Sequence, residues 1–195
     1  MILLTLAIVT AAACVQARDL QIPPTPSLTL CLNNPNFEMN LPYALVLSKR
    51  MFAGAGVAIE WRISRSCPAD GIRVQLRKSS GRSDHPGALA YARPFIHAAD
   101  ATESHVVILT DRIQNTVIPS LLPFLLSHVL VHEVTHVLQG IERHSEIGIM
   151  KARFETADLA AMRSQSLPFA NADLQLIEMG LRARQSQVAI DLDQQ

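Results

Sequence analysis

Alternating apolar and polar residues predict the β-strands of this chain. The clearest strand is predicted by a β-branched run over residues 105–110 (HVVILT), which Asp111 ends. A weaker strand is expected over residues 87–96 (GALAYARPFI), where Pro94 interrupts the pattern. Three segments alternate between apolar and polar residues with a period of two and are also predicted as strands: 27–32 (SLTLCL), 57–63 (VAIEWRI) and 72–76 (IRVQL).

Helical spacing of the apolar residues predicts helices around these strands. It covers residues 42–55, which a glycine-containing stretch closes. Near the end of the chain, Thr156 is expected to cap a short helix (ADLAAMRSQ). Asn171 is expected to cap a last helix that runs to about residue 185.

The longest apolar segment, residues 118–139, predicts a helix whose first turns contain Pro119 and Pro123. A membrane span is the alternative, but this segment also contains Ser127 and His128, and its apolar core is shorter than the roughly 20 residues a span needs. We therefore expect a central buried helix. The order of elements predicts an α+β fold, with a small mixed sheet packed on this helix and further helices behind it.

The N-terminus resembles an export signal. Residues 2–13 are continuously apolar, and small residues at 15–17 offer a cleavage point, although no Lys or Arg precedes the apolar run. We expect a signal peptide at residues 1–17 and one domain over 18–195, exported to the periplasm or the extracellular space. Lipoprotein processing at Cys14 is the alternative, because AAAC loosely resembles a lipobox.

Composition and charge narrow the classes of function. The 195 residues fit one domain, and 49% apolar with 17% charged residues excludes a disordered chain. Seventeen basic residues balance 17 acidic ones, so nothing indicates a nucleic acid or an acidic membrane as partner. Removal of the signal leaves Cys31 and Cys67, which can form a disulfide in an oxidising compartment or remain two buried thiols.

The motif HEVTH within the long helix carries the chemistry. Residues four apart lie on one helical face, so His132 and His136 can offer two ring nitrogens to one cation. Glu133 is rotated by one residue, which places its carboxylate beside the metal as a general base. Two core histidines without a metal are the alternative, and each would then need its own hydrogen-bonding partner.

A catalytic zinc site needs a third protein ligand from beyond the helix. Gly140 is the expected helix end, because a left-handed C-cap suits glycine, and His144 can then return to the metal. Glu146 and Glu155 are the competing third ligands. Of the other histidines, His128 is expected to support the site or the core. Surface positions are expected for His85, His97 and His105.

These residues resemble the metzincin clan of zinc metallopeptidases. The resemblance implies Glu133 as the general base, Gly140 as the turn glycine and Met150 as the methionine of the Met-turn. The spacing here is HExxHxxxGxxxH, with one more residue on each side of the glycine than the clan's HExxHxxGxxH. The zinc ligands that the resemblance implies are His132, His136 and His144.

A second resemblance covers about residues 28–180. AGV before a strand with Trp61, a Cys-Pro pair, ARPF, TDRI and SHVLVHEVTHVLQG…RHSEIGIMKARF are similar to a group of small exported bacterial zincin-like proteins, best known from acidobacterial genomes. This resemblance supports the zincin-like fold and the metal site, and it implies little about the substrate.

The expected function is hydrolysis of peptide bonds by a zinc-activated water, with Glu133 as base. The substrate would extend along an exposed strand edge, either 105–109 or 88–96. Alternatives are a zinc-containing binding or regulatory module of the same fold that cleaves nothing, and a structural envelope protein without metal. The candidates for a second oxyanion donor are Tyr91, Arg93 and His97.

Overall fold

The computed structural model describes residues 26–33, 40–80, 85–94 and 105–193. The expected signal peptide at residues 1–17, with Cys14, lies outside the described residues. The same is true of His97 and of the last two positions of the weak strand expected over 87–96.

Five strands form one mixed sheet. Parallel pairs join β1 to β2, β1 to β3 and β3 to β5, whereas β4 runs antiparallel to β5. The small mixed sheet that the sequence predicts is thus confirmed, and β4 lies on one of its edges. The strands are β1 Ser27–Asn33, β2 Ala58–Ile63, β3 Ile72–Arg77, β4 Ala90–Ala92 and β5 Val106–Leu109, in the spatial order β2-β1-β3-β5-β4.

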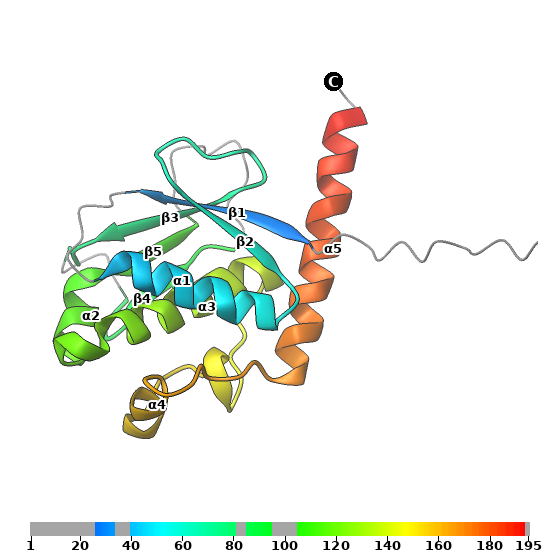
Figure 1. The fold of residues 1–195 in the computed structure, drawn as a ribbon. Coiled ribbons are helices and arrows are strands. Elements are labelled where there is room, and N and C mark those ends of the chain that lie inside the picture. The colour runs from blue at the N-terminus through cyan, green and yellow to red at the C-terminus, as the bar shows by residue number, and fades with distance from the viewer. Residues whose placement is uncertain (1–25, 34–39, 81–84, 95–104, 194–195) are drawn as a thin grey trace, which may run out of the picture.

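The helices gather against one face of the sheet and along one side of it. Figure 1 shows α1, α2 and α3 beneath the sheet, α4 farther below, and α5 running upward beside the other elements. Two short 3-10 turns, Pro119–Leu121 and Gly148–Met150, flank α3 in the sequence. The helices are α1 Leu41–Gly54, α2 Thr110–Thr116, α3 Leu122–Gln139, α4 Thr156–Ala161 and α5 Asn171–Asp193.

The centre of the protein is α3. Every residue from Leu125 to Gln139 is buried, including the polar ones. By length and composition the stretch Pro119–Gln139 could cross a membrane, but 83% of its apolar window is buried inside the protein. The helix therefore serves as the core of the fold, as the sequence predicts. Each buried Leu or Val on it stabilises the fold by about 1.5–3 kcal/mol.

The last helix, α5, approaches the end of α3 very closely. A Cβ atom at Gly180 would lie 1.7 Å from the carbonyl oxygen of Leu138. Only glycine permits this contact, so Gly180 sets the distance between the two backbones. Farther along α5, the Arg184 guanidinium donates a hydrogen bond to the Asp70 carbonyl oxygen at 2.7 Å, which ties the helix to the loop before β3.

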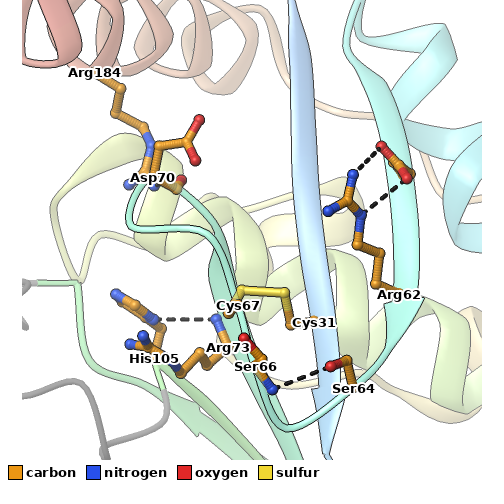
Figure 2. Close-up of a disulfide and its surroundings, with 10 residues drawn as sticks. Cys31, Arg62, Ser64, Ser66, Cys67, Asp70, Arg73, His105 and Arg184 are labelled. Carbon is orange, nitrogen blue, oxygen red and sulfur yellow. Dashed lines mark hydrogen bonds and ion pairs between the residues drawn. A yellow bond between two sulfur atoms is a disulfide. The ribbon is translucent and has the colours of Figure 1, made fainter. Parts of the chain in front are cut away.

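A disulfide joins β1 to that same loop (Figure 2). The Sγ atoms of Cys31 and Cys67 are 2.10 Å apart, and 36 residues separate the two positions. Closing a loop of this length restricts the unfolded chain by about 4 kcal/mol in the entropic account. Gly71 packs against the bridge, because a Cβ there would lie 2.6 Å from the Cys67 sulfur.

Two elements differ from the sequence-based expectation between residues 85 and 117. Within the described part of the strand expected over 87–96, only Ala90–Ala92 is a strand. One Arg112 nitrogen binds the carbonyl oxygens of both His85 and Ala88 at 2.7 Å, which holds the chain before β4 in a turn. The helix α2 was not predicted. Its seven residues are too few for the apolar period to be visible.

Two helix starts also differ. The expectation that Thr156 caps α4 is wrong, because Glu155 is the N-cap and forms a capping box with Asp158. Asn171 is the first residue of α5 rather than its cap. In the first turn of α5, the Asp173 carboxylate accepts a hydrogen bond from the Ala170 amide. The helix ends at Asp193, eight residues beyond the expected end.

The expected surface position of His105 is wrong. Its side chain is buried at the start of β5, where Nδ1 accepts a hydrogen bond from the Arg73 amide at 3.1 Å (Figure 2). Burial, and then the charges of Arg184 and Arg73, lower the pKa of His105 to about 4. The His105 ring is therefore neutral in the folded protein. It is buried because β5, which begins at the next residue, is covered along its whole length.

We predict that Gly180→Ala lowers the free energy of unfolding by about 1–3 kcal/mol, because the new methyl group must push α5 away from Leu138. Denaturant unfolding measures the change. Gly54→Ala is the matched control, since nothing lies within 4 Å of its added Cβ and the change is expected to be neutral or to stabilise by less than about 1 kcal/mol. Equal effects of the two substitutions would contradict the close helix crossing.

Candidate metal centre

The two histidines of HEVTH lie side by side near the end of α3. His132 and His136 project from one face of the helix, with ring centroids 4.7 Å apart. The helix ends at Gly140, whose φ of 65° is left-handed and whose amide binds the His136 carbonyl oxygen at 2.9 Å. This is the glycine C-cap that the sequence predicts, and it turns the chain back toward the two rings.

Backbone carbonyls fix the orientation of both rings. The Nδ1–H of His132 donates to the Ile149 carbonyl oxygen at 2.8 Å, and that of His136 donates to the Ile141 carbonyl oxygen at 3.1 Å. A carbonyl only accepts, so each Nδ1 carries the proton and each Nε2 presents a lone pair. This is the arrangement in which a histidine serves as a metal ligand whose other nitrogen is held in place.

His144 completes a group of three possible ligands. Its ring centroid lies 5.3 Å from that of His132 and 4.9 Å from that of His136. The three offered nitrogen atoms lie within 4.8 Å of one another. The structure therefore brings together the three residues that the sequence suggests, two from the helix and one from the chain that returns after Gly140.

The donor set fits a cation. The Nε2 atoms of His132 and His136 are only 3.1 Å apart, and both present lone pairs, which repel each other unless a positive charge lies between them. Tetrahedral zinc with bonds of about 2.0–2.1 Å separates its nitrogen ligands by about 3.3 Å. The observed spacing of this pair is close to that value.

Burial keeps the rings of His132 and His136 neutral. It lowers the pKa of His132 to about 4, and the neighbouring His136 and His144 act in the same direction. Burial also lowers the pKa of His136, against the hydrogen bond to the Ile141 carbonyl. Both imidazoles are therefore neutral at physiological pH, which metal coordination requires.

Glu133 lies beside the histidines and lines the same cleft. Its side chain is buried, and burial alone raises its pKa to about 8. No cation or hydrogen-bond donor pairs with this carboxyl group in the part of the chain that the structure describes. A carboxyl group in such a setting can take up and release a proton near neutral pH.

The turn after His144 is bonded both to the loop that carries His144 and to His132. Met150 is fully buried in the 3-10 turn Gly148–Met150, and its carbonyl oxygen accepts a hydrogen bond from the Ser145 amide at 2.8 Å. The preceding carbonyl, that of Ile149, is the one that holds His132. Met150 is therefore in the turn whose Ile149 carbonyl orients the His132 ring.

The competing third ligands lie in other roles. Glu146 is exposed and does not line the cleft. Glu155 does line the cleft, but its carboxylate caps α4 and pairs with Lys151 at 3.4 Å. Among the described residues, the group of three potential ligands that includes the two helix histidines contains His144 and neither glutamate.

His128, one helical turn before His132, is a core residue with backbone partners. Its Nδ1 donates to the Phe124 carbonyl oxygen at 2.7 Å, and its Nε2 accepts from the Leu167 amide at 3.1 Å. Both ring nitrogens are therefore in use, and burial lowers its pKa to about 4. His85 is exposed, as expected, and its ring lies edge-on to Tyr91.

A cleft of about 890 Å³ opens over the three histidines. Its walls come from the segment that leads into β4, from α3 and from the chain after Met150. Of the suggested oxyanion donors, Tyr91 lines the cleft and its hydroxyl accepts a hydrogen bond from Arg77 at 3.1 Å. Arg93 does not line the cleft, and its guanidinium lies over the Tyr91 ring.

Several residues of the site were not found from the sequence. The Ile141 and Ile149 carbonyls act through the backbone, which leaves no trace in residue type. The cleft wall also uses Phe154 and Leu159, which follow the motif. Their nearness to the motif in the chain was the available signal, but apolar residues there equally suit a core.

Comparison with known proteins supports the fold. No protein-family model matches the chain, and no curated protein does. The structure is similar to archaemetzincin from Methanopyrus kandleri, with a TM-score of 0.53, 15% sequence identity, and coverage of 83% of this chain and 99% of that one. Two structures of myroilysin align with TM-scores of 0.40 and 0.34 at 14% and 15% identity. They cover 73% and 59% of this chain, which spans 61% and 45% of theirs.

We predict that the protein binds one zinc ion and that His144→Ala weakens this binding by more than the roughly 10–100-fold typical of residues that only support a ligand. Competition with a chelating dye measures the affinity, and a zinc-dependent rise in Tm checks it independently. Glu146→Gln and Glu155→Gln are the controls and are expected to leave the affinity unchanged. A loss in either control, with His144→Ala neutral, would assign the third ligand to that glutamate.

Proposed function

We propose that this protein is a zinc-dependent metallopeptidase that hydrolyses peptide bonds in polypeptides. The observation that carries the proposal is the convergence of His132, His136 and His144 in an open cleft. Beside them lies the carboxyl group of Glu133, which has no partner among the described residues. The fold shared with archaemetzincin supports it. A metal enclosed on all sides would serve structure, whereas this cleft leaves room for water and a peptide.

The three histidines would hold the ion through nitrogen atoms, and the Ile149 and Ile141 carbonyls would keep two of those rings aligned. When bound, zinc supplies a Lewis acid that lowers the pKa of a coordinated water and stabilises developing negative charge. Met150 would fix the turn beneath the site. In this proposal Met150 corresponds to the methionine of the metzincin Met-turn.

Glu133 would serve as general base and then as general acid. Its carboxylate would take a proton from the attacking water and later deliver it to the departing amine. Burial against apolar neighbours makes its proton affinity high for a carboxylate, which favours both steps near neutral pH. A nearby divalent cation would favour the ionised form, which the first step needs.

The edge strand β4 would bind the substrate backbone. The strand over 105–109 is excluded from this role, because β5 pairs with β3 on one side and with β4 on the other. In the register of β4 with β5, Leu89 and Arg93 bond to β5, so the N–H and C=O groups of Ala90 and Ala92 face outward. An extended peptide could add to this edge as a further strand.

The cleft also offers an apolar wall next to Glu133. Leu125 and Val129 contribute from α3, and Phe154 and Leu159 from the chain beyond Met150. Apolar side chains gain roughly 25 cal/mol for each Å² removed from water. We therefore expect peptides with a large apolar residue next to the cleaved bond to be preferred.

Export is the remaining part of the proposal. The Cys31–Cys67 disulfide is stable in an oxidising compartment, which supports a secreted or periplasmic domain over residues 18–195 after removal of a signal at 1–17. The resemblance to small exported bacterial zincin-like proteins points the same way. N-terminal sequencing of the mature protein would identify the cleavage position.

We predict that Glu133→Gln lowers kcat for a quenched-fluorescence peptide by about 10²–10⁴-fold and leaves zinc binding intact, because it removes proton transfer without removing a ligand. Glu142→Gln is the matched control. It changes an exposed carboxylate that lines the same cleft, and is expected to keep most of the activity.

Equal turnover by the wild-type and Glu133→Gln proteins would contradict the assigned base. Zinc bound at one equivalent, with no cleavage of casein or a peptide library by the wild type, would instead favour a zinc-containing binding module.

We predict that Ala92→Pro raises KM for peptides by about 2–10-fold, because it removes one outward N–H donor worth about 0.5–1.5 kcal/mol. Proline is tolerated on an edge strand, so the fold and zinc affinity are expected to persist. A substrate analogue in which a methylene group replaces the matching carbonyl lacks the acceptor and should show no such penalty. An equal rise in KM for both substrates would contradict backbone pairing at β4.

A further inference from the structure

The buried carboxylate of Asp173 is neither a member of the histidine group nor a participant in the proposed reaction. It belongs to the first turn of α5 and its side chain is completely buried. Burial of a charge costs several kcal/mol unless hydrogen bonds and an opposite charge compensate it. The partners of Asp173 therefore indicate what it does.

Two of these partners flank the third histidine. Oδ1 of Asp173 accepts hydrogen bonds from the Ser145 hydroxyl at 2.6 Å and from Arg143 Nη1 at 3.0 Å. Arg143 also donates to the Ser145 hydroxyl at 3.3 Å. The residues immediately before and after His144 are thus bound to one oxygen atom.

The remaining bonds of Asp173 anchor it to rigid elements. Oδ2 accepts from the Ala170 amide at 3.0 Å, which closes the first turn of α5. The Asp173 carbonyl oxygen accepts from Gln139 Nε2 at 3.3 Å, and Gln139 is the last residue of α3. Asp173 therefore links the end of the helix that carries His132 and His136 to the loop that carries His144.

His144 needs such a link more than its partners do. His132 and His136 are buried, and each ring is held by a carbonyl. The His144 side chain is exposed, and in the described part of the chain its ring contacts the other two histidines without a hydrogen bond that fixes it. Its position depends on the backbone of its loop. One side of that loop is held by the Ser145 amide bond to Met150, and the other by Asp173.

We infer that Asp173 is a positioning residue for the third ligand: through Arg143 and Ser145 it holds His144 where a metal shared with His132 and His136 can bind it. This inference rests on the metal-binding part of the proposed function. The negative charge of Asp173 also lies close enough to act on His132 and His136, so it favours a cation at the centre in addition to holding the loop.

The test is a double-mutant cycle with zinc alone as the probe. Asp173→Asn keeps the size of the side chain but removes its charge and one acceptor. It is expected to weaken zinc binding by about 10–100-fold, as loss of a residue that orients a ligand does. In a His144→Ala background the same substitution should have at most a small effect of a few-fold, because the ligand that it positions is gone. Glu178→Gln, an exposed carboxylate on the same helix, is the control and should be neutral in both backgrounds.

A second readout does not depend on zinc. In the metal-free protein, Asp173→Asn is expected to raise amide hydrogen exchange over residues 141–147 while α3 stays protected. If Asp173→Asn does not fold, Ser145→Ala keeps the carboxylate and removes one of its two bonds to the loop. It should show a smaller loss of zinc affinity that also vanishes without His144.

The outcomes separate the two proposals. A wild-type protein that binds no zinc overturns the proposed function and the ligand role of His144. A wild-type protein that binds zinc, with equal losses from Asp173→Asn in the presence and absence of His144, overturns only the positioning role. Unchanged exchange over residues 141–147 in a folded Asp173→Asn protein also overturns the positioning role.

Discussion

The candidate metal centre of this protein depends on two hydrogen bonds from histidine rings to backbone carbonyls. They fix the protons of His132 and His136 on Nδ1 and leave two Nε2 lone pairs 3.1 Å apart. That spacing is unfavourable for neutral nitrogen atoms alone and suits ligands of one ion. Both carbonyls, Ile141 and Ile149, belong to the chain that follows α3, so the two helix histidines are held by the same segment that carries His144.

The rest of the fold keeps that segment in register with the helix. Burial of α3 on all sides prevents it from rotating, and the close approach at Gly180 seats α5 against its last turn. From the first turn of α5, Asp173 binds the loop on both sides of His144. Farther along α5, Arg184 ties the helix to the disulfide-bonded loop before β3. Contacts far from the cleft therefore help to hold the segment that carries His144.

The sequence predicts those parts of the molecule that local patterns determine. Strands at 27–32, 57–63 and 72–76 and the buried helix over 118–139 follow from periodicity, and the structure has them within a few residues. Gly140 follows from helix-end chemistry. The α+β class follows from the order of the elements and is confirmed by the described fold and its likeness to archaemetzincin.

Other features depend on contacts between distant residues, so the sequence does not reveal them. Arg112 shortens β4 by binding two carbonyls of the chain segment before it, more than twenty residues away in the sequence. His105 looks like a polar strand end, but the fold covers it. Asp173 resembles an ordinary acidic residue in a first helical turn, and its bonds to Arg143 and Ser145 exist only once α5 packs against α3.

The most direct test of this account is the coordination of zinc in the purified protein, measured by X-ray absorption at the zinc edge. We predict three imidazole nitrogens and one oxygen at about 2.0–2.1 Å, with one imidazole fewer in a His144→Ala variant. A wild-type spectrum with sulfur ligands, or with only two imidazoles, would contradict the central claim that three histidines from the helix and its returning loop share one ion.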